Sequence, residues 1–213
     1  ALTSSNAGMQ VLLLESDFII GGSLNSLDRN NSLWLKKSIA ELESNRNVRI
    51  STRTQVLKKD RDGWFLAIEK SYQQDKRHNI RPIYKLFKIK AKHAFIATGA
   101  TERIPLSLKQ NISGIMSTTI FSNFVNRFGL GPNDGVTVYT NNDSGWRVVK
   151  QLIELGIKVD AVIDTRPGAK MVADCPVFRG ARIIDTVGRS ELCAVIIRDL
   201  YGQRKKIRTS LLA

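Results

Sequence analysis

The sequence predicts an α/β protein that contains two successive βαβ-type subdomains. Three observations support this prediction. A short apolar run at 11–14 ends at Glu15, which is typical of a buried strand in a parallel sheet. A second apolar run, 94–97, ends in small residues. A strand–helix–strand pattern then follows at 136–164, and its length of about 30 residues is that of one βαβ unit.

The first subdomain is predicted to span residues 1–113. Residues 1–7 have the pattern of a short helix, which Gly8 would end in a left-handed conformation. A second helix is predicted at 33–44, with Ser32 as its N-cap, because Leu35, Ile39 and Leu42 fall on one stripe.

The rest of this subdomain is predicted to be mainly β-structure. Residues 48–70 alternate like strands around an Asp-Gly turn at 60–63. The polar stretch 73–81 is expected to be an exposed loop, followed by a strand at 83–89. Residues 94–100 are expected to form a buried strand.

The second subdomain is predicted to span residues 114–213. Apolar residues at helical spacing from 117 to 128, closed by Gly129, predict a helix. The βαβ unit comprises a strand at 136–139, a loop at 141–145, a helix at 146–155 and a strand ending at Asp164. Short strands are expected from residue 181 onward, with a hairpin at 199–202.

The chain has a net charge of +14, and most of the excess lies in one segment. Residues 46–92 contain 14 Lys and Arg against 4 Asp and Glu. Basic and apolar residues alternate there with period two, which favours a strand with one solvated basic face. A polyanion or an acidic partner subunit is the alternative that the charge leaves open.

Other composition features narrow the functional class. Cys175 and Cys193 form no CxxC motif and no cluster with His78 or His93, so no metal site is assigned and free thiols in a reducing cytoplasm are expected. Neither an apolar run of about 18 residues nor a signal peptide is present, so we expect no membrane association. Both chain ends are interpreted as cut points in a longer protein.

Glu15 is the most informative candidate residue. In a dinucleotide-binding βαβ unit, an acidic residue ends the second strand and binds the adenosine ribose, about 20 residues after a glycine fingerprint. That spacing would place the first strand and the Gly-rich loop before Ala1. An ordinary strand-end carboxylate is the alternative interpretation. Small residues that would allow a cofactor close to the backbone follow at two places: Gly21, Gly22 and Ser23, and Ala97, Thr98 and Gly99.

The order of these motifs resembles a known superfamily. Glu15-Ser16-Asp17, Gly21-Gly22-Ser23-Leu24 and the segment 97–103 are similar to the two-dinucleotide-binding-domain flavoproteins, which have a glutathione-reductase-like FAD/NAD(P)-binding fold. The loop 139–144, together with Asn126-Arg127-Phe128-Gly129, resembles more specifically the alpha subunits of heterotetrameric sarcosine oxidases.

This resemblance implies a division of labour. The alpha subunit would bind NAD (or FAD) in its first site, and it would assemble with beta, gamma and delta subunits into a complex that also holds FAD and FMN. The complex would oxidatively demethylate a small amine, sarcosine. Glu15 would hold the ribose, Gly21, Gly22 and Ser23 would line the cofactor, the Val56 backbone would meet the adenine, and Ala97, Thr98 and Gly99 would close the far side. No catalytic residue is assigned to this chain.

Several alternatives remain open from the sequence. The loop 141–145 lacks the glycines of a GxGxxG motif, so Asn141 and Asp143 are expected to cap the following helix rather than to bind a nucleotide. A proline or opine dehydrogenase subunit and a FAD-dependent pyridine nucleotide reductase are related possibilities. A basic nucleic-acid-binding module is the non-enzyme alternative. It is disfavoured because the aromatic residues of segment 46–92 occupy alternating core-type positions.

Overall fold

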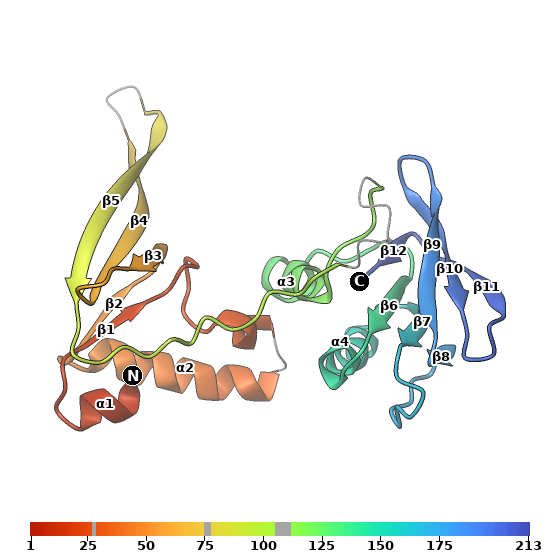
Figure 1. The fold of residues 1–213 in the computed structure, drawn as a ribbon, viewed down its shortest axis with the longest axis horizontal. Helices are drawn as coiled ribbons and strands as arrows, with labels where there is room; N and C mark the ends of the chain where they lie inside the picture. The colour runs from red at the N-terminus through yellow and green to blue at the C-terminus, as the bar shows by residue number, and fades with distance from the viewer. Residues whose placement is uncertain (27–28, 75–77, 105–111) are drawn as a thin grey trace. The chain divides into compact units, whose positions relative to one another are not determined.

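The computed structural model describes residues 1–26, 29–74, 78–104 and 112–213, and its elements belong to two compact units, Ala1–Gly99 and Ala100–Ala213 (Figure 1). The predicted subdomain boundary between residues 113 and 114 stays a prediction.

The first unit begins with a small α/β layer. It consists of α1 (Leu2–Asn6), β1 (Val11–Leu14), the 3-10 helix η1 (Gly22–Ser26), α2 (Arg29–Ser44) and β2 (Val48–Ser51). β1 pairs in parallel with β2, and Leu35 and Leu42 of α2 are buried. The prediction of Ser32 as an N-cap is wrong, because α2 begins at Arg29 and includes Ser32. Asn and Ser are only mildly unfavourable inside a helix, so the polar stretch extends it.

A three-stranded antiparallel sheet completes the first unit. Its order is β3 (Thr54–Lys59), β4 (Trp64–Gln74) and β5 (Ile80–Lys90). The predicted Asp-Gly turn joins β3 to β4: Gly63 has a φ of 82°, and Asp60 Oδ1 accepts a hydrogen bond from Trp64 N at 2.8 Å.

The predicted loop at 73–81 is wrong at both of its ends. β4 continues to Gln74 and β5 starts at Ile80, with Gln74 opposite Ile80 and Tyr72 opposite Pro82. Residues 75–77 lie outside the described part. Pro82 is compatible with a strand here because β5 is at the edge of the sheet, where a missing N–H removes no ladder bond.

The predicted buried strand at 94–100 is also wrong. This segment joins no strand ladder in the described part of the chain, and Phe95 and Ile96 are 89% and 83% exposed. A strand requires a hydrogen-bonded neighbour, and the described residues provide none for this segment. β1, the strand expected in the same sheet, pairs only with β2 there.

The second unit is built on a parallel sheet with the order β12-β6-β7-β8. Its elements are α3 (Thr118–Phe128), β6 (Val136–Thr140), α4 (Asp143–Glu154), β7 (Val159–Asp164), β8 (Val177–Arg179), β9 (Arg182–Gly188), β10 (Leu192–Arg198), β11 (Arg204–Arg208) and β12 (Leu211–Leu212). The helix at 118–128, the βαβ unit, the short strands after residue 181 and the hairpin after β10 confirm the predicted pattern, whereas β8 and the parallel pairing of β12 with β6 were not anticipated.

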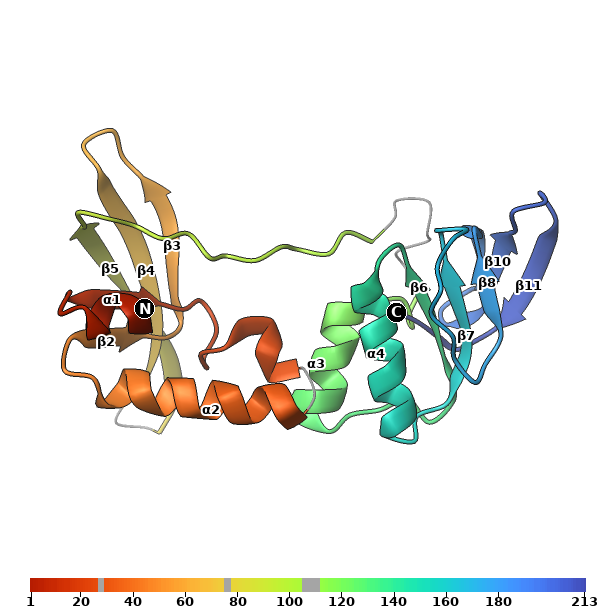
Figure 2. The ribbon, with the colours of Figure 1, turned by 90° about the horizontal axis from the view of Figure 1, so that it is seen from below.

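Helices α3 and α4 lie on one side of this parallel sheet and the antiparallel strands β9 and β10 on the other (Figures 1 and 2), and an apolar core lies on each side. One packs α3 and α4 against the sheet and includes Phe121, Val138, Trp146 and Leu152. The other lies between the sheet and the antiparallel strands β9 and β10, and includes Ile163, Val195 and Ile197. Asn126, one of the residues that carried the resemblance, joins α3 to α4 through two hydrogen bonds with Gln151, at 3.2 and 3.0 Å.

No helix in the described ranges is both long enough and apolar enough to cross a membrane.

Candidate functional site

Glu15 lies directly after β1, and its backbone is hydrogen-bonded both to the end of β2 and to the start of β3. Its backbone N donates to Ser51 O at 2.9 Å, and its backbone O accepts from Thr54 N at 2.8 Å. The half-buried side chain turns back, so that Oε1 accepts from Asp17 N at 2.9 Å and from Ser16 Oγ at 3.3 Å. The carboxylate is therefore held at the carboxyl end of the parallel pair, the edge at which α/β sheets bind ligands.

The glycines after Glu15 have different local environments. Gly21 has a φ of 121°, a backbone conformation that favours glycine with or without a cofactor, and a Cβ there would also lie 2.7 Å from Leu35 Cδ2 of α2. Gly22 has a φ of 51° and has open space around it, and Ser23 is exposed in η1. A cofactor role for Gly22 and Ser23 is compatible with this geometry and stays a prediction.

The remaining predicted cofactor residues lie farther along the first unit. Val56 is exposed on β3, two residues after the buried Thr54 that contacts Glu15. Ala97, Thr98 and Gly99 are exposed in the extended segment after β5. A hydrogen bond thus connects Glu15 to the start of β3. Among the described residues, no hydrogen bond connects residues 97–99 to Glu15 or to β3.

In the second unit, the loop between β6 and α4 differs from the prediction. α4 begins at Asp143 instead of Trp146, and its N-cap is Asn142, whose side chain accepts from Ser144 N at 2.9 Å. The caps predicted at Asn141 and Asp143 are wrong. Asn141 Oδ1 instead accepts from Asn142 Nδ2 at 2.9 Å, and Asp143 is the first residue of the helix.

Gly145 allows α4 to pack closely on β6. A Cβ at this position would lie 2.2 Å from Thr140 Oγ1. That hydroxyl is fixed, because it donates to Asn142 O at 2.9 Å and accepts from Asn142 N at 3.2 Å. The loop therefore keeps the glycine that close helix–strand packing requires, although it lacks the glycines that admit a pyrophosphate.

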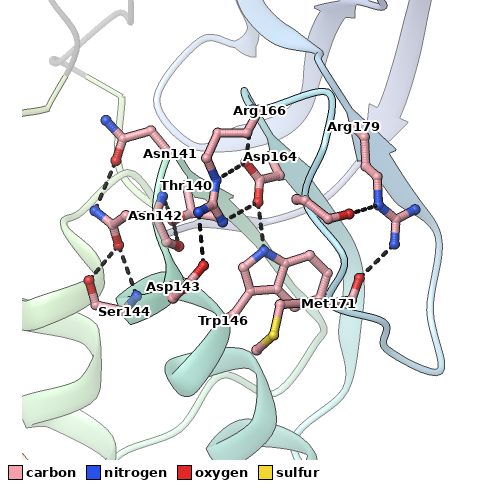
Figure 3. A network of polar contacts seen from close by, with 11 residues as sticks. Thr140, Asn141, Asn142, Asp143, Ser144, Trp146, Asp164, Arg166, Met171 and Arg179 are labelled. Carbon is pink, nitrogen blue, oxygen red and sulfur yellow. Dashed lines mark hydrogen bonds and ion pairs between the residues drawn. The ribbon is translucent and has the colours of Figure 1, made fainter.

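A polar cluster of Asp143, Trp146, Asp164 and Arg166 closes this end of the βαβ unit (Figure 3). Asp164 is 0% exposed and accepts four hydrogen bonds. One comes from Trp146 Nε1 at 2.7 Å, and three come from Arg166, through its N at 2.9 Å, Nε at 3.1 Å and Nη2 at 2.9 Å. The third guanidinium nitrogen, Nη1, binds Asp143 Oδ1 at 2.8 Å.

The charges in this cluster stabilise one another. Burial by itself would raise the pKa of Asp164, but the hydrogen bonds from Arg166 and Trp146 hold that pKa below its ordinary value. The pKa of Arg166 is raised, because Asp164 and Asp143 accept its hydrogen bonds.

The polar cluster occupies the two features that would bind a nucleotide in a βαβ unit, namely the strand-end carboxylate and the first turn of the helix. The acid that ends the second strand of such a unit would normally bind ribose, and the first turn of the helix would face pyrophosphate. Here both oxygens of Asp164 accept from Arg166 or Trp146, and the carboxylate of Asp143 lies in the first turn of α4. Residues 143–166 therefore do not fit a dinucleotide.

Glu102 is a second carboxylate whose role the sequence did not reveal. It accepts hydrogen bonds at the N-terminus of α3 from Thr118, through N at 3.2 Å and Oγ1 at 2.7 Å, and from Thr119, through N and Oγ1, both at 3.0 Å. Partial burial would raise the pKa of Glu102, but these bonds lower it. The only sequence signal was the pair of threonines after Ser117, which indicates a helix start without indicating a distant carboxylate.

Several solved structures share the fold of this chain. L-proline dehydrogenase from P. horikoshii superposes with a TM-score of 0.67 at 18% identity, over 100% of this chain and 38% of that protein. The NADH-bound water-forming NADH oxidase from Lactobacillus brevis gives 0.61 at 11% identity, over 99% and 49%. Bacillithiol disulfide reductase from Bacillus cereus gives 0.58 at 12%, over 100% and 71%. The predicted α/β fold of the FAD/NAD(P)-binding oxidoreductases is confirmed.

Sequence comparison gives a narrower result. No protein-family model matches the chain. It is similar along its whole length to sarcosine oxidase subunit alpha of Rhizobium meliloti (strain 1021), with 30% identity over 228 residues, and over 96% of its length to that of Corynebacterium sp. (strain P-1), with 28% identity over 221 residues. The chain spans 22–23% of the length of these relatives. The resemblance to sarcosine oxidase alpha subunits is thereby confirmed.

Proposed function

We propose that this chain forms the dinucleotide-binding part of an alpha-type subunit in an oxidoreductase that demethylates sarcosine. The position of Glu15 carries the proposal: a carboxylate fixed after a parallel strand, at the edge where this fold binds its cofactor. Similarity over 100% and 96% of the chain to two proteins named sarcosine oxidase subunit alpha supports the choice of reaction.

In this proposal only the first unit binds the cofactor. The Glu15 carboxylate accepts hydrogen bonds from the adenosine ribose of NAD, or of FAD, and its contacts with Asp17 and Ser16 orient it. Gly22 and Ser23 lie on the chain that follows, and Val56 is two residues from the Thr54 that contacts Glu15. Ala97, Thr98 and Gly99 close the site from the far side.

The second unit has a structural task in this proposal. Its Asp143, Arg166 and Asp164 bind one another and hold α4 on the sheet. The amine chemistry belongs to the assembled complex with beta, gamma and delta subunits, in which FAD and FMN would supply electron transfer.

The test is a pair of variants of the intact protein, Glu15→Ala and the control Glu43→Ala, which removes an exposed carboxylate from α2. A hydrogen bond to a charged group contributes about 1.5–3 kcal/mol, so Glu15→Ala should raise the Kd for NAD or FAD about ten- to a hundredfold. NADP should bind more weakly than NAD, because its 2′-phosphate would face the carboxylate.

Isothermal titration with NAD, NADP and FAD measures these constants. An unchanged Kd in Glu15→Ala would show that Glu15 is an ordinary strand-end carboxylate. In the assembled complex, sarcosine should be oxidised in preference to L-proline, and the reverse preference would assign the chain to a proline dehydrogenase.

A further inference from the structure

The sheet formed by β3, β4 and β5, whose strands Figure 2 shows as ribbons, combines lysine, aromatic and aliphatic residues on one of its faces by strand register. Register places Trp64 opposite Lys90, Leu66 opposite Lys88, Ile68 opposite Leu86 and Lys70 opposite Tyr84, and alternate residues of a strand share a face. We call this the lysine–aromatic face, which is defined by Trp64, Lys70, Tyr72, Leu86, Lys88 and Lys90. The opposite face carries the fully buried Ala67 and the half-buried Phe65 and Phe87.

The lysines of this face are held over aromatic rings. Lys88 Nζ and Lys90 Nζ lie 4.8 and 5.3 Å from the centroid of the Trp64 ring, and Lys70 Nζ lies 5.5 Å from that of Tyr72. No carboxylate is on this face among the residues that the structure describes, since Glu69 pairs with Lys85 on the other side. The ammonium groups of Lys70, Lys88 and Lys90 therefore have no neutralising acid on their own face in the described part of the sheet.

The same face exposes large apolar side chains. Leu86, Tyr84 and Ile80 are 65%, 58% and 70% exposed. β3 covers the sheet only as far as the pair Thr54–Glu69, so β4 and β5 continue beyond it as a two-stranded ribbon. Such a ribbon is only marginally stable in water, and exposed apolar surface of this kind marks an interaction site.

We propose that the lysine–aromatic face docks an acidic surface of a partner protein subunit. This rests on the proposed function, which places the chain in a multi-subunit complex. Charge complementarity selects the acidic partner. The apolar side chains between the lysines favour a protein over a single-stranded nucleic acid, because stacked bases would have to displace the ammonium groups that cover the Trp64 and Tyr72 rings.

The experiment compares two triple variants of the intact protein with equal change in charge. Lys70→Glu/Lys88→Glu/Lys90→Glu reverses the proposed face, and Lys36→Glu/Lys37→Glu/Lys206→Glu reverses exposed lysines on α2 and β11. The probe is the set of subunits encoded beside this chain, co-expressed and purified, and the readout is their Kd by surface plasmon resonance. We expect the first variant to bind at least about tenfold more weakly and the control to bind like the wild type.

Four outcomes would overturn the proposal. The first is equal affinity of the two triple variants for the partner subunits, and the second is no measurable binding of these subunits by the wild type. The third is protection of Lys70, Lys88 and Lys90 from acetylation in the intact protein without its partners. The fourth is binding of single-stranded DNA of about 20 nucleotides that the variant of the lysine–aromatic face loses and the control variant keeps. The Kd for NAD or FAD, measured on the same variants, separates this result from the proposed function. Both triple variants should bind the dinucleotide as tightly as the wild type does. If the wild type itself bound neither NAD nor FAD, the proposed dinucleotide binding would be refuted instead.

Discussion

Asp164→Asn removes the charge at the centre of the second unit's polar cluster while keeping the shape of the side chain. The amide replaces one acceptor oxygen by an NH2 group, which would face the N–H groups of Arg166 or Trp146. Because Trp146 is almost completely buried, an unsatisfied indole N–H has no access to water.

The magnitude of this change follows from the contacts. Breaking a buried ion pair from one side costs about 3–5 kcal/mol. The Arg166 side chain is 36% exposed and keeps Asp143, so part of its charge stays solvated and paired. We therefore expect Asp164→Asn to lower the free energy of unfolding by about 2–3 kcal/mol, which lowers Tm by about 5–10 °C for a chain of this size.

Urea denaturation followed by circular dichroism measures the loss, and Asp143→Asn is the matched control. Asp143 is largely exposed, so its variant should lose much less stability. Equal losses in the two variants would refute the view that Asp164 anchors the cluster. The dissociation constant for NAD should be the same in both variants, because neither residue is proposed to bind it.

Two further predictions follow from the packing and the charges. Gly145→Ala should lower stability by about 1–3 kcal/mol, because its methyl group would meet the fixed Thr140 hydroxyl, whereas Gly156→Ala, with open space around it, tests the backbone effect alone. The folded pKa values of Glu102 and Asp164 lie below the unfolded values of 4.5 and 3.8, so their stabilisation is complete above those values and is lost as the pH falls through the lower folded ones. Glu102→Gln should therefore flatten the fall of Tm between about pH 5 and 3, and an unchanged slope would contradict its role at α3.

Local pattern was sufficient for much of the fold. Apolar spacing and capping residues located α3 between Ser117 and Gly129, and the Asp-Gly turn located the β3–β4 hairpin. These elements depend on residues close together in sequence. The prediction of a buried strand at 94–100 was wrong because a strand depends on residues that are distant in sequence. The composition of this segment suits a buried strand, but a strand also needs a hydrogen-bonded neighbour in space.

In the candidate site, too, features set by residues close in sequence could be predicted, whereas features set by tertiary packing could not. Glu15 and Asp164 were recognised as strand-end acids, because position in a βαβ unit can be read from sequence. What each carboxylate binds could not be read, since Trp146 and Arg166 meet Asp164 only after the sheet and α4 pack together. The stabilising role of Glu102 depends on Thr118 and Thr119, which are 16 and 17 residues away.

β12 joins two segments of the second unit that are far apart in sequence. Leu212 N donates to Gly114 O at 2.7 Å, Met116 N donates to Leu212 O at 3.0 Å, and Ile115 and Leu212 form a parallel bridge. The same two-residue strand pairs with β6, so it ties residues 114–116 to the parallel sheet. The strand is thus shared by the sheet and by the segment that leads into α3, so the sheet edge and the start of this helix should open together rather than separately.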